Sequence, residues 1–335
     1  MIALILVGLV LSILFMQFVI TPRVAGHLYY GYSFDTELAE PGEKITYSDR
    51  LVNNFFLPVS YISLALALPE GAKISEKTGN NDAYRIWLPP FNSSRHTLSF
   101  TLPRRGVYRG GRYFMETGDL LGFKSFVKSG KIAANITVMP RKCEDELILQ
   151  TLGGYIGDIS VKRFIIEDPM LTIGFNDYTG REPMKKISWP LSARKGKLVV
   201  KNYDYTVDVS VIVVLNLASG SAREKEKCLE ITRTACEQLE SKHIPYQFLS
   251  NGDVNERKEG FGKMHLNAIM TDLGRSELIS YSSFDTLIDR CIQKRKNNRS
   301  YIIISSPLSE SDRVSLHKLN KFCDYAPCVL EAEVN

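Results

Sequence analysis

The distribution of apolar residues divides the chain into stretches of different kinds, and the first is almost wholly apolar. Residues Ile2 to Ile20 carry no charge. A helix of that length rises 1.5 Å per residue and so comes close to the thickness of a bilayer core. A cleaved signal peptide is the competing interpretation, but it usually begins with basic residues and ends at a small-residue cleavage site. We therefore predict a transmembrane anchor over residues 1–21.

The charge that follows this anchor predicts its orientation. Arg23 is the first charged residue after the apolar run. Because basic residues concentrate on the cytoplasmic side of membrane helices, the sequence predicts a single-pass protein of the cell membrane with its other domains in the cytoplasm.

Short apolar and aromatic runs fill residues 24–142. They are rich in Tyr, Phe, Ile, Val and Thr, and Pro, Gly and Asn separate them. Pro41-Gly42 and Gly110-Gly111 are strong turn signals. Repeated short strands with turns between them are typical of an antiparallel β-sandwich, which we predict here.

The pattern changes again in residues 206–335, where strands and helices alternate. Residues 207–217 form a continuous apolar run, as expected for a strand buried on both faces of a parallel sheet. An amphipathic helix follows, and the alternation continues to the end of the chain. The expected fold is thus multidomain: an N-terminal transmembrane helix, an antiparallel β-sandwich, and an α/β, Rossmann-like domain with a mostly parallel sheet.

Charge and cysteine usage exclude some functions. The net charge is +5, and the basic residues look scattered along the chain, which gives no support for a nucleic-acid partner. None of the six cysteines forms a C-x-x-C pair, so we interpret them as reduced residues of apolar cores rather than as disulfides or zinc ligands. They are Cys143, Cys228, Cys236, Cys291, Cys323 and Cys328.

Residues 150–205 fit neither a simple helix nor a simple strand, and they contain Trp189, one of two tryptophans. A tryptophan in such a polar stretch is expected to bury its rings. Arg194 is expected to bond to carbonyl groups or to a carboxylate such as Glu182.

A motif in this region resembles that of the domain of unknown function 58 (DUF 58) family. Its W-x-x-S-A-R core is intact, whereas Asn176, Arg181, Glu182 and Lys185 replace the Arg, Gly, Asp and second Arg of the family pattern. We expect the motif to have a structural or docking role. Its positions here are Tyr178, Glu182, Lys185, Ile187, Trp189, Ser192, Ala193 and Arg194.

Other parts of the chain are similar to the same family. An R-R-G-x-Y element occupies residues 104–108, and a strand ending in Pro-Arg occupies residues 138–141. Residues 119–123, Asp-Leu-Leu-Gly-Phe, resemble the D-x-x-G-x-F element of the family but are one residue shorter. Most members of the family have two membrane helices near the start, whereas this sequence shows one. The resemblance implies that residues 206–335 form a von Willebrand factor A-like domain.

In that fold a metal ion is bound at the end of the first strand by Asp-x-Ser-x-Ser. The aligned residues here are Asn216, Ala218 and Gly220. A hard cation prefers anionic oxygen ligands, but these side chains offer one neutral amide oxygen. We therefore predict a degenerate site without metal, and no cofactor.

Nearby residues leave two alternatives open. Ser219 and Ser221 lie one position away from the ligand positions, so a shifted site remains conceivable. Asp253 and Asp272 follow in later loops, and each alone would make a poor site.

No H-E-x-x-H, P-loop or G-x-S-x-G motif is present, so nothing in the sequence predicts an enzyme. The family resemblance implies a membrane-anchored interaction or scaffold protein that acts with a MoxR-type AAA+ ATPase in assembly or envelope-related processes, with other operon-encoded partners conceivable. The alternative is a metal-dependent adhesion or sensing module of the von Willebrand factor A type.

Overall fold

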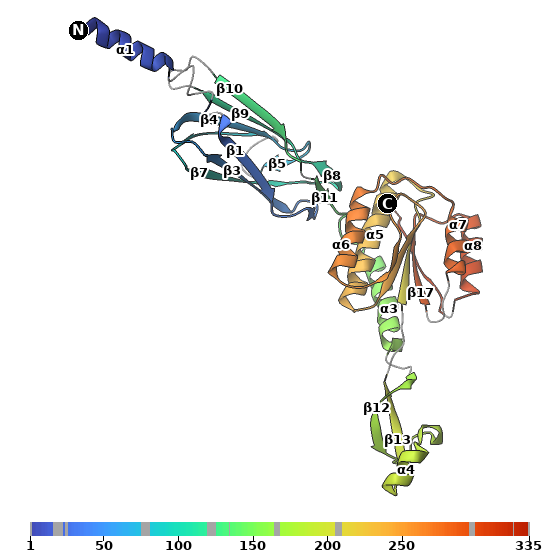
Figure 1. Cartoon of the computed structure of the whole chain (residues 1–335). Coiled ribbons are helices and arrows are strands. Elements are labelled where there is room, and N and C mark those ends of the chain that lie inside the picture. Colours follow the sequence, from blue (N-terminus) through green and yellow to red (C-terminus); the bar gives the residue numbers. More distant parts are fainter. Residues whose placement is uncertain are drawn as a thin grey trace. The chain divides into compact units, whose positions relative to one another are not determined.

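The computed structural model describes residues 2–15, 23, 26–74, 81–118, 125–133, 135–163, 168–204, 210–294, 299–323 and 325–333. The chain divides into two compact units, Met1–Arg141 and Lys142–Asn335 (Figure 1). The segment at residues 119–123 that resembles the D-x-x-G-x-F element lies outside the described residues.

The first helix is α1 (Ile2–Phe15), which lies within the predicted membrane anchor. Within the described part of the chain, none of the helices combines the length and apolarity that a membrane crossing requires. The predicted fold class is therefore wrong in its transmembrane helix. The predicted localisation, single-pass in a cell membrane with the other domains in the cytoplasm, is wrong with it.

The first unit is β-sandwich-like. One sheet has the order β1 (Leu28–Phe34), β3 (Lys44–Asn53), β7 (Ser93–Thr101), β5 (Lys73–Ile74). A second has the order β10 (Ser125–Lys131), β9 (Arg112–Gly118), β4 (Val59–Ala67), β6 (Asn81–Leu88). A third, small sheet has the order β2 (Leu38–Ala39), β11 (Asn135–Val138), β8 (Gly106–Arg109).

Alternation of side chains explains the core of this unit. Strand β3 buries every second residue, among them Ile45, Tyr47 and Leu51, while the residues between them are less buried. Successive side chains of a strand point to opposite faces, so one face of β3 enters the core. Strand β4 contributes Ile62 and Leu64 to the same apolar cluster.

A buried polar group connects the two large sheets. Asp49 of β3 is almost fully buried, and its Oδ1 accepts a hydrogen bond of 2.7 Å from the Tyr84 hydroxyl of β6. The other carboxylate oxygen of Asp49 lies 3.7 Å from Nδ1 of His96, its cross-strand neighbour on β7. Burial is the dominant effect on this carboxyl group, and it raises the pKa of Asp49.

The second unit contains a five-stranded sheet between layers of helices. Its order is β16 (Arg257–Gly260), β15 (Tyr246–Ser250), β14 (Ser210–Leu215), β17 (Arg299–Ser305), β18 (Cys328–Glu331). All neighbours are parallel except β16, which runs antiparallel to β15. Figure 1 shows α7 (Phe284–Gln293) and α8 (Glu310–Asn320) on one side of the sheet. The other side carries α3 (Glu146–Arg163), α5 (Ala222–Ser241) and α6 (Lys263–Arg275).

Strand β14 shows why this sheet needs both layers. All of its residues are buried, which is the pattern of a strand covered on both faces. The helix that follows it, α5, begins at Ser221 with a capping box, in which Ser221 and Glu224 each bond to the other's backbone N–H.

A separate hairpin lies between α3 and β14 in the sequence. Strands β12 (Asp168–Asp177) and β13 (Val199–Asp204) pair antiparallel. Between them come the short 3-10 helix η2 (Met184–Lys186) and the helix α4 (Trp189–Lys195), which Figure 1 shows at the far end of the hairpin. Residues 150–205 are therefore more regular than predicted, because their first part continues α3.

Candidate functional site

The DUF 58-like motif lies at the end of this hairpin, in residues 177–201, which we call the hairpin tip. Backbone hydrogen bonds close the tip onto the two strands. The N–H of Tyr178 donates to Leu198 O at 2.9 Å, and the N–H of Ser188 donates to Val199 O at 2.8 Å. Ile187 forms an isolated antiparallel bridge with Val200. The chain between the strands is therefore folded back on them rather than left as an open loop.

A small buried cluster holds α4 in place. Ile187, Val199 and Val200 are all buried, and Ser192 of α4 is buried beside them. The hydroxyl oxygen of Ser192 accepts a hydrogen bond of 2.9 Å from Val199 N–H. Gly196 then ends the helix in the left-handed conformation, with φ of 65°. Ser192 and Ile187 are thus the structural members of the motif.

Trp189 is not buried, contrary to the sequence prediction. It follows the N-cap residue Ser188 and is 59% exposed. Arg194 is also exposed, and no hydrogen bond or ion pair of its guanidinium is found among the described residues. Glu182, its predicted partner, instead accepts hydrogen bonds from the N–H and hydroxyl of Thr179, and these bonds lower the pKa of its carboxyl group.

Exposure separates the W-x-x-S-A-R motif into two sets of residues. Ser192 is buried and accepts its hydrogen bond from Val199 N–H, whereas Trp189, Ala193 and Arg194 are exposed. Trp189 and Ala193 are four residues apart and so share one side of the helix, and Arg194 follows Ala193. We call Trp189, Ala193 and Arg194 the outer face of α4.

Further exposed apolar and basic groups occur in the hairpin tip and the adjoining strand β12. Met184 is 67% exposed, and Phe175 and Leu198 are also exposed. The tip contains seven basic and two acidic residues, a net charge of +5. The remainder of the chain has 35 of each sign, so the basic residues are not scattered as predicted. A charge count over a sliding window would have found this concentration.

The corner at Asn216, predicted to be a degenerate metal site, is closed by hydrogen bonds. Asn216 is fully buried at the carboxyl end of β14. Its Nδ2 donates to the Ser305 hydroxyl at 2.8 Å, and its Oδ1 accepts from Ala218 N–H at 3.0 Å and from Asn251 Nδ2 at 2.7 Å. Asn251 Oδ1 in turn accepts from Leu217 N–H at 2.8 Å. The amide that would be a metal ligand therefore joins three segments of the chain.

The alternatives for a shifted metal site receive no geometric support. Gly220 has φ of 95°, and a Cβ there would lie 2.5 Å from the Ser306 side chain. Ser306 donates to the carbonyl of Ser219 at 2.6 Å, which keeps that loop closed. Asp253 bonds to Ser276, and Asp272 bonds to Arg257. The described residues contain no cluster of three or more His, Cys, Asp or Glu able to hold a metal.

The cysteines lie in the cores. All six are free thiols, and all but the half-buried Cys323 are buried. Burial raises the pKa of Cys228 to about 12 and that of Cys328 to about 11, so neither thiol is a ready nucleophile at neutral pH.

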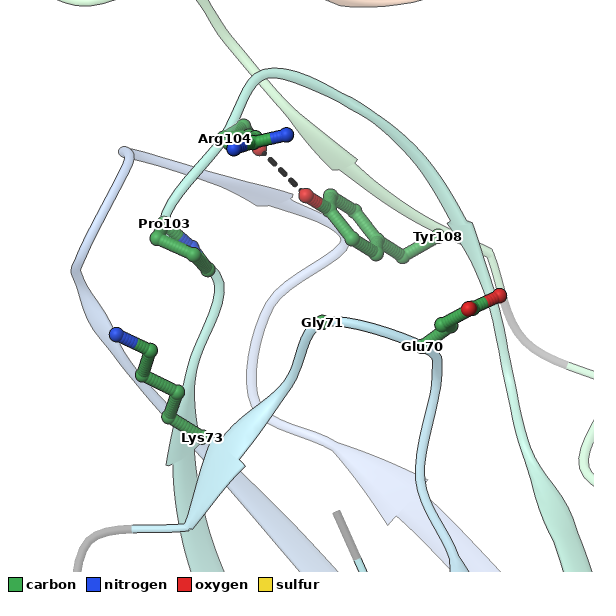
Figure 2. A pocket seen from close by; sticks show the side chains of 6 residues that line it. All are labelled: Glu70, Gly71, Lys73, Pro103, Arg104 and Tyr108. Atoms are coloured by element: carbon green, nitrogen blue, oxygen red, sulfur yellow. Dashed lines mark hydrogen bonds between the residues drawn. The ribbon is translucent and has the colours of Figure 1, made fainter. Parts of the chain in front are cut away.

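A hollow of about 610 Å³ on the first unit includes part of the R-R-G-x-Y element. Figure 2 shows Lys73, Arg104 and Glu70 at its edges with their charged ends pointing apart. The Tyr108 hydroxyl donates to Arg104 O at 2.9 Å, which fixes the loop. Because the charged groups do not converge on one point, this hollow lacks the arrangement of a catalytic or anion site.

Comparison with known proteins gives no family assignment. Searches against protein-family models and against curated proteins each returned no match. Among solved structures, the chain is similar to the cupredoxin domain of amoB from Nitrosocaldus yellowstonii, with 10% identity, a TM-score of 0.24 and coverage of 33% of this chain and 86% of that one. It is also similar to a CARDB domain from Pyrococcus furiosus solved with di-metal ions, with 13% identity, a TM-score of 0.22 and coverage of 33% and 91%. At these values neither likeness bears on function.

Proposed function

We propose that the chain is a non-enzymatic docking protein that acts with a MoxR-type AAA+ ATPase and binds it through the hairpin tip. The observation that carries this proposal is the exposure of Trp189 on a helix that is otherwise fixed to its hairpin. Exposed tryptophan and arginine side chains, both present on α4, are among the residue types that dominate the energy of protein interfaces.

The magnitude of the Trp189 contribution is large enough for a specific contact. An aromatic side chain buries about 150–250 Å² when it is covered, and more than half of Trp189 is free to be covered. At about 25 cal/mol per Å², burial of about 100 Å² contributes about 2.5 kcal/mol, close to a hundredfold in affinity.

Preorganisation supports the same role. The Ser192–Val199 hydrogen bond and the buried Ile187 fix α4 before any partner arrives. A rigid binding element loses little conformational entropy on association, so more of the contact energy becomes affinity.

The identity of the partner rests on the resemblance to the DUF 58 family, through the W-x-x-S-A-R core. That resemblance implies that the protein acts together with a MoxR-type AAA+ ATPase in assembly or envelope-related processes. A docking role also agrees with the divided motif, because Ser192 serves the fold while Trp189, Ala193 and Arg194 are left to contact another molecule.

Calorimetry of the full chain with a purified MoxR-type ATPase tests the proposal. We expect saturable binding that Trp189→Ala weakens at least 30-fold. The matched control is Trp87→Ala, since Trp87 is 65% exposed but lies on β6 of the other unit. Absence of binding, or equal loss in both variants, would refute the proposal.

A further inference from the structure

We infer that the hairpin tip binds an acidic protein surface with an apolar recess for Trp189; this inference rests on the docking function proposed above. Its first support is the charge distribution. The entire net charge of +5 belongs to residues 177–201, and the remainder of the chain is balanced. A protein whose net positive charge is concentrated in one segment attracts acidic partners to that segment.

The acidic residues of the tip do not offset this field at its outer face. Asp177 binds the ammonium group of Lys197 at 2.5 Å, and Glu182 accepts its two bonds from Thr179. No salt bridge of Lys185, Arg194 or Lys195 occurs among the described residues, and all three are exposed. Their charges are therefore available to a partner next to Trp189.

The apolar and basic groups of the tip have different consequences for binding. Exposed charge pairs add little to affinity individually, but a set of them accelerates association and selects partners of opposite charge. Such steering weakens with salt, because the screening length is about 10 Å at 0.1 M ionic strength. Trp189 should therefore determine how long the complex lasts, and the basic residues how fast it forms.

The shape of the tip favours a protein over a lipid surface. The exposed apolar groups come from separate segments: Met184 from η2, Trp189 from α4 and Leu198 from the turn before β13. Helix α4 has only seven residues, too few to present the broad apolar stripe of a helix that lies in a lipid interface. Met, Trp and Arg are in turn the types enriched in protein interfaces.

The test uses the full chain in a Trp87→Phe background, so that Trp189 is the sole tryptophan. The charge-reversed variant is Lys185→Glu with Arg194→Glu and Lys195→Glu. The matched control reverses three exposed basic residues of the first unit, Lys44, Arg109 and Lys131. Association with a MoxR-type ATPase is followed by Trp189 fluorescence between low and physiological salt. A parallel titration uses an amphipathic peptide of glutamate and leucine, a lysine–leucine peptide of the same pattern, and phosphatidylcholine vesicles containing phosphatidylserine.

We expect the association rate with the ATPase to fall at least tenfold with salt and with charge reversal, but not in the control. Binding that is insensitive to both overturns the acidic surface and leaves the docking function standing. If the ATPase does not bind but the glutamate peptide does so saturably, the docking partner is wrong and the acidic surface stands. The inference is overturned if the chain binds the vesicles but not the glutamate peptide. It is also overturned if both peptides bind equally, or if none of the probes binds.

Discussion

Replacement of Asn216 by alanine should destabilise the second unit strongly, although the sequence predicts that this position belongs to a degenerate metal site. The substitution removes three hydrogen bonds, to the Ser305 hydroxyl, Ala218 N–H and Asn251 Nδ2, at 2.7–3.0 Å. Asn216 and Ser305 are fully buried, so water cannot replace their bond freely. At about 1 kcal/mol per bond, with a further contribution from the void, the loss is about 3–5 kcal/mol. The total free energy of unfolding of a typical domain is about 5–15 kcal/mol, so this loss would be a large part of it.

Hydrogen–deuterium exchange of the β14 amides measures this loss directly. A decrease of about 3 kcal/mol in the free energy of opening corresponds to a loss of protection of more than 100-fold. Ser219→Ala is the matched control, because the Ser219 hydroxyl has only a 3.4 Å contact with Ser306 and its carbonyl keeps its bond. Protection within about threefold of the unchanged chain would refute the reasoning. A loss seen only with magnesium present would show instead that Asn216 is a ligand.

Three further predictions follow from the same structure. Calorimetry with magnesium or manganese should show no saturable binding at the Asn216 corner; micromolar one-to-one binding lost in Asn216→Ala would favour the metal-dependent adhesion or sensing module. Trp189→Ala should change the free energy of unfolding of the hairpin by less than about 1 kcal/mol, and Ile187→Ala should lower it by about 2–5 kcal/mol, as measured by exchange of the β13 amides; equal losses would place Trp189 in the core. Asp49→Asn should stabilise the first unit at pH 7, because burial raises the pKa of this carboxyl group and the folded state therefore binds more protons than the unfolded state. The unsubstituted chain should lose stability as pH rises from about 3.9 through the raised pKa, by about 1.4 kcal/mol per unit of pKa difference, and thermal unfolding of the variant should lack that slope.

Local periodicity was sufficient for the elements whose side chains obey one simple rule. The residue types of the run over β3 predicted a strand, and the apolar run over β14 predicted a strand covered on both faces. Both patterns follow from burial, because buried positions of a strand are mostly occupied by apolar residues and these can be read from the sequence. The apolar run of residues 2–20 led to a wrong prediction of a transmembrane helix, because none of the helices among the described residues is both long and apolar enough to cross a membrane.

The candidate site depended on contacts that no local pattern contains. The exposure of Trp189 follows from the turn that places Ser192, three residues later, against Val199. A single sequence gives no sign of which side of a seven-residue helix will face the hairpin. In the same way, the bond between Asn216 and Asn251 joins residues 35 positions apart. The concentration of positive charge in residues 177–201 could have been predicted from the sequence, but a net charge taken over the whole chain does not show where the charge lies.

The division of α4 into an inner and an outer face makes this segment suitable for transplantation. Its inward attachment uses Ser192, with Ile187 just before the helix and Gly196 just after it. The outward side chains have no hydrogen bond or ion pair among the described residues, so they can vary while the attachment stays constant. Exchanging only Trp189, Ala193 and Arg194 between related chains should therefore transfer partner choice from one chain to another. After a gene duplication, substitutions at these three positions would give the two copies different partners without any change of fold.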